Sequence, residues 1–219
     1  MKKRTIYRYL SISAAASALM LVGMLVVTVF NAGLTAQDFE LFDDPGRYAA
    51  GLLDVEQPLR AILSLDNLFL IFYTAAFIFL ATAVWNKGNR ILVVVALSAL
   101  LTTAYLDLNE NHSIMVFIAM AREGVAISPE MLARHSVLSQ LKFHSSYLSF
   151  FLFAFVLPKK TTLEKLLRWS LWLVFAPVGV LVYTFPSPLL SIARYLLMLA
   201  GLSLLAWNYW LRAQKKADR

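Results

Sequence analysis

Six long apolar blocks, separated by segments richer in polar residues, run along this chain. Each block approaches the about 20 apolar residues that a helix needs to cross the hydrocarbon core of a bilayer. We therefore predict an all-α integral membrane protein, a six-transmembrane-helix bundle that forms a single membrane domain over residues 1–219. Pro177 with Gly179 predicts a kink in the fifth span. The predicted spans are roughly 9–31, 62–85, 91–112, 135–157, 167–185 and 188–210.

The composition agrees with this pattern. Of the 219 residues, 60% are hydrophobic and 15% are charged, whereas an ordinary soluble domain has about 25% charged residues. The first block continues through Leu21–Phe30, which is longer than a typical signal-peptide core, so we expect this helix to be retained. The absence of cysteine excludes disulfides and thiolate metal sites.

Basic residues gather in the segments on one side of the six-span arrangement. These segments precede the first span, follow the sixth, and join the second span to the third and the fourth to the fifth; together they hold 14 of the 20 Lys and Arg residues. Because basic loops mark the cytoplasmic face, we predict that both termini are cytoplasmic. The net charge of +7 therefore reports topology, so we expect membrane lipids as partners and no nucleic acid.

Two long segments, about 33–61 and 113–134, lie on the opposite, outer side. The first contains the turn sequence Asp43–Gly46, followed by an amphipathic pattern that predicts a short helix on the outer surface. In the second, 114–120 is apolar but too short to span, which leaves two alternatives: an extension of the third helix or a lid. Ser128–Glu130 predicts the start of a new helix, with a capping serine and a proline at the first helical position.

Ionisable and amide side chains occur inside the predicted spans, where charges are costly and persist mainly in protected cavities. Asp107, Glu110 and Asn111 share one helical face because they are three and four residues apart. In the six-span topology, these residues and those of three other spans lie at similar depth, in the outer third of the membrane. We therefore predict an outward-facing polar pocket whose ligand-binding residues are Asp66, Asn67, Asp107, Glu110, Asn111, Ser139, Lys142 and Arg194.

The same region holds the candidates for chemistry. Asp107 and Glu110 are candidate general acid/base residues, and His112 and His135 are candidate proton shuttles. The two histidines are also the candidate metal ligands, but the chain has neither HExxH nor HxxxH spacing, so we predict no metal site. No cofactor is predicted, because no phosphate loop or dinucleotide motif is present.

One resemblance covers about residues 60–145. Leu65-Asp66-Asn67-Leu68-Phe69 with Tyr73, then Asp107-Leu108-Asn109-Glu110-Asn111, then Leu141-Lys142-Phe143 resemble a family of uncharacterised bacterial multi-pass membrane proteins with an intramembrane Asp-x-x-Glu-Asn motif and a later Lys. This resemblance implies a protein of the bacterial inner membrane and supplies no activity.

Three functions stay open from the sequence. The pocket could bind a lipid-like or small polar ligand, with carboxylates near a lysine suiting proton coupling. The protein could instead be a membrane enzyme that modifies a lipid or isoprenoid by carboxylate and histidine chemistry. The third alternative is an accessory subunit of a membrane complex, in which the polar residues only tie helices together, and an oligomer or complex partner is compatible with all three.

Overall fold

The computed structural model describes residues 2–41, 43–185 and 187–215, and every regular element in these ranges is helical. The all-α prediction is confirmed for this part of the chain. The elements are α1 (Lys3–Phe30), η1 (Ala36–Phe39), α2 (Pro45–Asp54), α3 (Glu56–Val84), α4 (Arg90–Arg122), α5 (Pro129–Val156), α6 (Thr162–Trp169), η2 (Ser170–Phe175), α7 (Ala176–Thr184) and α8 (Pro188–Gln214).

Five helices of the described residues are long and apolar enough to cross a membrane. They are α1, α3, α4, α8 and the continuous helical stretch Thr162–Thr184, which comprises α6, η2 and α7. α5 is 28 residues long, but its first half carries His135, Ser139 and Lys142, which lower its hydropathy. Five helices thus have the length and apolar composition that a multi-pass membrane protein requires, and the count of six spans stays a prediction.

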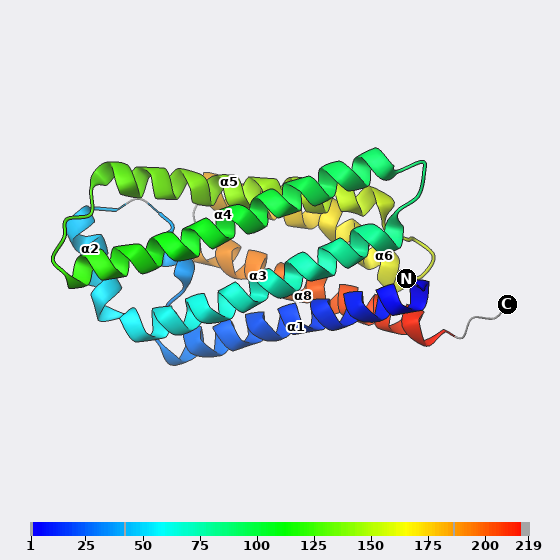
Figure 1. Cartoon of the computed structure of the whole chain (residues 1–219), viewed down its shortest axis with the longest axis horizontal. Coiled ribbons are helices and arrows are strands. Elements are labelled where there is room, and N and C mark those ends of the chain that lie inside the picture. The colour runs from blue at the N-terminus through cyan, green and yellow to red at the C-terminus, as the bar shows by residue number, and fades with distance from the viewer. Residues whose placement is uncertain (1, 42, 186, 216–219) are drawn as a thin grey trace.

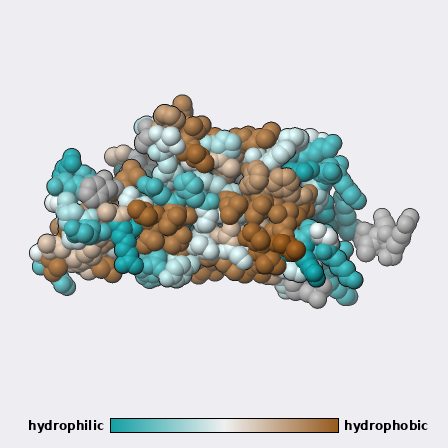
Figure 2. Space-filling model, turned by 90° about the horizontal axis from the view of Figure 1, so that it is seen from above, coloured by the Kyte–Doolittle hydropathy of each residue, from teal (hydrophilic) through white to brown (hydrophobic). Residues whose placement is uncertain are grey.

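The long helices form a closed ring. α1 packs against α3 and α8, α3 against α4, α4 against α5, α5 against α7, and α7 against α8. Successive helices run in opposite directions, so the N-terminus and the end of α8 lie at the same end of the bundle and α2 lies at the other (Figure 1). Figure 2 shows hydrophobic residues over much of the middle of the bundle and hydrophilic residues gathered at both ends.

The segment 113–134 is mostly helix. α4 continues without interruption to Arg122, so the extension of the third helix is the correct alternative and a separate lid is not formed here. The physical reason is that Ile114, Phe117 and Ile118 are buried at helical spacing, where this part of α4 packs against α2. Ser128 begins α5 as predicted, since its side chain accepts a hydrogen bond from the Met131 amide.

The predicted surface helix is α2. The Asp44 side chain accepts hydrogen bonds from the amides of Gly46 and Arg47, and the helix buries Tyr48 and Leu52. The Tyr48 hydroxyl donates a hydrogen bond of 3.0 Å to the Phe39 carbonyl. This bond holds the end of η1 against α2, and the next residue, Glu40, belongs to the site described below.

The helix type changes within the fifth span, next to the residues that predict a kink. A π-helical turn, η2, lies immediately before the α-helical turn that contains Pro177. Proline cannot donate a backbone hydrogen bond and clashes with the preceding turn, and single π-helical turns commonly accommodate such disruptions.

Candidate functional site

A cavity of about 150 Å3 lies inside the ring of helices. At one end its lining is charged, and along the rest of its length the lining is aliphatic and aromatic. The charged residues of the lining are Glu40, Asp66, Asp107, Glu110, Lys142 and Arg194. The apolar lining includes Phe77 and Leu80 of α3, Leu100 of α4, Phe150 of α5, Leu167 of α6, and Leu202 and Leu205 of α8.

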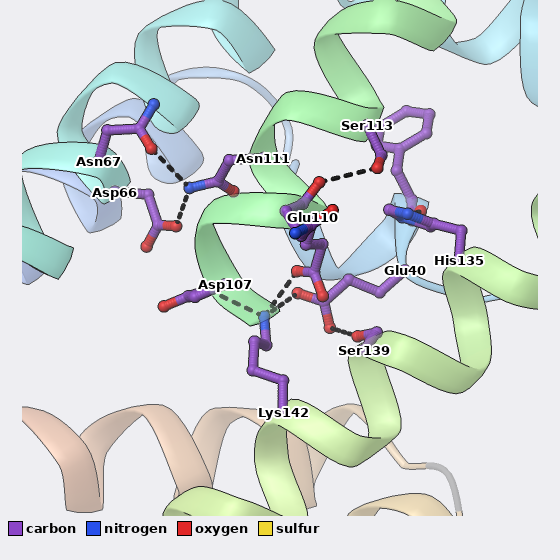
Figure 3. Close-up of polar contacts among 12 residues, drawn as sticks. Glu40, Asp66, Asn67, Asp107, Glu110, Asn111, Ser113, His135, Ser139 and Lys142 are labelled. Atoms are coloured by element: carbon purple, nitrogen blue, oxygen red, sulfur yellow. Dashed lines mark hydrogen bonds and ion pairs between the residues drawn. The ribbon is translucent and has the colours of Figure 1, made fainter. Parts of the chain in front are cut away.

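Lys142 is the centre of the charged end. Its ammonium nitrogen lies 2.6 Å from a Glu110 carboxylate oxygen, 3.2 Å from Asp107 and 3.4 Å from Glu40 (Figure 3). The Lys142 side chain is 7% exposed, and the three acidic side chains are 3–11% exposed. Asp107 and Glu110 reach the same amine because residues three apart on α4 share a face.

Glu40 is the member of the cluster that the sequence analysis missed. It follows η1 in the outer loop, yet only 4% of it is exposed. The Ser139 hydroxyl donates to Glu40 over 3.2 Å, and the neighbouring Phe39 carbonyl contacts His135 as well as Tyr48. No helical spacing marks a loop residue, so the only available signal was an acidic residue in a loop on the same side as Lys142.

The electrostatics of Glu40 show how strongly the cluster depends on Lys142. Burial raises the pKa of the Glu40 carboxyl, but the Lys142 ammonium and the hydrogen bond from Ser139 lower it. The net pKa of Glu40 lies below its ordinary value. Glu40 is therefore held as a carboxylate by its positively charged neighbour.

A second polar group joins α3 to α4. The Asn111 amide donates to Asp66 over 2.7 Å and to Asn67 over 3.2 Å. The Tyr73 hydroxyl donates to the second oxygen of Asp107 over 3.3 Å. The structure thus brings the predicted residues of α3 and α4 together, and Asp107 links this group to Lys142.

Arg194 shares the cavity but not the ion-pair network. Among the described residues no carboxylate lies within 4 Å of its guanidinium, although Arg194 is only 8% exposed. The guanidinium carbon lies 4.2 Å from the centroid of the Phe143 ring. Lys142 contacts the same ring, 4.4 Å from its centroid, so the two basic groups border one aromatic side chain.

The four candidate catalytic residues have different surroundings, and neither histidine lies within 4 Å of a carboxylate oxygen among the described residues. Asp107 and Glu110 lie at Lys142, whereas His112 is exposed on α4. His135 is buried, with its Nε2 3.2 Å from the Phe39 carbonyl oxygen. In the described ranges, no group of three or more His, Asp or Glu side chains could hold a metal ion.

Two buried polar atoms of the lining have no hydrogen-bond partner among the described residues. They are Oε2 of Glu110 and the hydroxyl of Tyr147, and both residues line the cavity. Buried polar atoms are almost always paired in native proteins. These atoms are therefore available to a ligand or to water in the cavity.

Chemically, the charged end offers more hydrogen-bond acceptors than donors around Lys142 and more donors than acceptors around Arg194.

Comparison of the chain with protein-family models, with curated proteins and with solved structures found no match.

Proposed function

We propose that this multi-pass membrane protein binds an amphiphilic, lipid-like molecule. The polar headgroup lies at the charged cluster and the hydrocarbon chain follows the apolar part of the cavity. The observation that carries this proposal is that one cavity is lined both by the buried ionisable residues and by apolar residues of α3, α5, α6 and α8.

The shape of the cavity supports a chain-like ligand. From Asp66 to Leu80, both of which line it, α3 rises about 21 Å at 1.5 Å per residue. A volume of about 150 Å3 along such a length describes a narrow channel. An elongated, narrow cavity suits a hydrocarbon chain better than a compact solute.

The alternatives explain less of the structure. A small polar ligand would occupy the charged end and leave the apolar channel unused. A purely structural network would account for Lys142 and its carboxylates but not for the cavity beside them. For an enzyme, the histidines would have to pair with the acid/base carboxylates, but neither His112 nor His135 lies within 4 Å of a carboxylate oxygen among the described residues.

The proposal includes the orientation and the location. The basic segments at residues 3–4, 87–90 and 159–160 adjoin the ends of helices on the side of the bundle that holds the start of α1 and the end of α8 (Figure 1). Basic segments favour the cytoplasmic face, so the charged cluster would face outward in a bacterial inner membrane. Carboxylates outnumber basic side chains in the cluster, and we therefore expect ligand binding to be accompanied by a change in bound protons.

The test blocks the channel without disturbing the headgroup site. Gly201 lines the cavity, and a Cβ atom added there would meet no heavy atom within 4 Å. Gly201→Leu should therefore fill the channel, about 10 Å along α8 from Arg194, without a clash. The matched control is Ala200→Leu, at the adjacent, exposed position of α8.

Binding of fluorescent amphiphiles with one headgroup and either a hexadecyl or a hexyl chain would be measured on the purified chain in detergent. We expect Gly201→Leu to lower the affinity for the hexadecyl ligand by about tenfold, the equivalent of about 1.4 kcal/mol, and to leave the affinity for the hexyl ligand unchanged. Ala200→Leu should change neither affinity. Equal binding of the hexadecyl ligand by both variants and the wild type would refute the assignment of the channel.

A further inference from the structure

Arg194 and Tyr147 line the cavity, and Tyr183 accepts a hydrogen bond from Arg194. Together they form a group of potential hydrogen-bond donors separate from the Lys142 ion pairs. We propose that these three residues are a subsite for an oxyanion with a single negative charge, at the head of a hydrocarbon chain. The anionic group is a carboxylate or a phosphodiester. This inference rests on the proposed function and specifies the headgroup that the site accepts.

Lys142 is not available for that headgroup. An ammonium group has three N–H donors, and Lys142 has three carboxylate neighbours within 3.4 Å. An incoming anion would have to displace one of these carboxylates and would meet the repulsion of the other two. The basic group that is nearest to Lys142 across the Phe143 ring is therefore the one that remains to bind an anion.

Arg194 has the opposite surroundings. Its only hydrogen bond to a described side chain is a long one, 3.5 Å from Nη1 to the Tyr183 hydroxyl. A guanidinium has five N–H donors in a planar fork that matches carboxylate and phosphate oxygens. The face of Phe143 supplies part of the stabilisation that this buried cation needs, and an anion would supply the rest.

The Tyr147 hydroxyl is the second, independent observation. Tyr147 is 4% exposed and lines the cavity, and its hydroxyl has no hydrogen-bond partner of standard geometry among the described residues. Its ring is held in place by Gly179, where an added Cβ would lie 2.1 Å from a ring carbon. The glycine therefore permits the ring to pack directly on the backbone of α7.

The donors come from three elements and point to one kind of ligand. Tyr147 lies on α5, Tyr183 on α7 and Arg194 on α8. A guanidinium and phenolic hydroxyls can all donate, and hydrogen bonds from such a set to an ionised oxygen are stronger than those between neutral groups. The set thus favours an anionic headgroup over an alcohol or an amine.

The residues around the subsite limit the charge of its ligand and favour a ligand with a hydrocarbon chain. The carboxylates of Glu40, Asp107 and Glu110 surround a single lysine, so a dianion at the adjacent subsite would be repelled more strongly than a monoanion. Met198 and Leu202 follow Arg194 by four and eight residues on the same face of α8, and both line the cavity. The subsite therefore opens onto the apolar channel.

The test compares three probes that differ only in the headgroup: palmitate, hexadecanol and hexadecylamine. Their affinities for the purified full chain in a neutral detergent would be measured by displacement of a fluorescent hexadecyl ligand. We expect palmitate to bind at least about tenfold more tightly than hexadecanol, because charge-assisted hydrogen bonds replace neutral ones. Hexadecylamine should bind most weakly of the three.

Two variants assign the preference to the subsite. Arg194→Gln should lower the affinity for palmitate about tenfold or more and change the affinity for hexadecanol by less than about twofold. Tyr147→Phe removes only the unpaired hydroxyl and should lower the affinity for palmitate by a smaller factor, about threefold. Arg47→Gln, which removes the same charge from an exposed position of α2, is the control and should change nothing. If Arg194→Gln does not fold, Tyr147→Phe and Arg194→Lys give the same comparison.

A parallel measurement with phosphatidylglycerol and diacylglycerol distinguishes the source of the anion. Either a preference for palmitate or a preference for phosphatidylglycerol that depends on Arg194 supports the subsite and identifies which class occupies it. Equal binding of charged and neutral probes, or equal loss of both in Arg194→Gln, overturns the subsite but leaves the amphiphile proposal standing. Failure of every probe to bind overturns the proposed function itself.

Discussion

Replacing Lys142 by methionine tests whether this one side chain holds the charged end of the cavity together. Methionine has a similar length and no charge, so the substitution leaves the packing of α5 largely in place. It removes the only ammonium that the structure places within 4 Å of Glu40, Asp107 and Glu110. Three buried carboxylates would then face one another without a counter-ion.

The magnitude follows from the separations. At 2.6, 3.2 and 3.4 Å, an effective dielectric constant of about 20 gives about 5–6 kcal/mol of attraction for each pair. Repulsion among the carboxylates and the cost of removing the charges from water offset most of this attraction. We therefore expect Lys142→Met to lower the free energy of unfolding by about 3–5 kcal/mol, as is typical when one partner of a buried ion pair is removed.

The loss should depend on pH. Burial raises the pKa of Glu40, and Lys142 lowers it, with a net value below the ordinary 4.5. In the wild type, Glu40 contributes stability above the unfolded-state pKa, and this contribution is lost as the pH falls through the lower folded-state pKa. Without Lys142 the pKa of Glu40 moves upward, so the variant tolerates protonation better. The difference in the free energy of unfolding between wild type and variant should therefore become smaller as the pH falls from about 7 to about 5.

The measurement is equilibrium unfolding in mixed micelles, followed by far-UV circular dichroism at several pH values. Lys87→Met is the matched control, because Lys87 is exposed in the turn between α3 and α4, and it should change stability by less than about 0.5 kcal/mol. A loss for Lys142→Met below about 1 kcal/mol, or one that is the same at both ends of the pH range, would contradict the ion-pair assignment.

Two further substitutions test the local structure in the same unfolding assay. Gly179→Ala should destabilise the protein by about 1–3 kcal/mol, because the new Cβ would lie 2.1 Å from a ring carbon of Tyr147. Gly201→Ala should instead stabilise it by about 0.5–1 kcal/mol, because nothing lies within 4 Å of the added Cβ. Equal effects at the two glycines would disprove the contact between Gly179 and Tyr147. Ser128→Ala should cost about 1 kcal/mol, since it removes the acceptor of the Met131 amide at the start of α5, and an unchanged unfolding midpoint would show that this cap contributes nothing.

The site was predictable where helical spacing alone brings residues together. Asp107, Glu110 and Asn111 share a face of α4 because of their spacing, and topology placed Lys142 at a similar depth. The spacing of residues within one helix does not determine which neighbouring helix each side chain contacts. Arg194 was therefore expected in the same cluster, whereas its guanidinium lies over the Phe143 ring, with no carboxylate of the described residues within 4 Å.

The helical spans, the approximate limits of the long helices and the polar face of α4 are determined by the sequence itself, because hydropathy and helical periodicity are local properties of the chain. Only the tertiary structure decided that the helices close into a ring around a cavity, since this depends on how each helix rotates about its axis. It also decided that the loop after η1 carries Glu40 inward to Lys142, so that one of the three carboxylate partners of this lysine is a residue that no periodicity could identify.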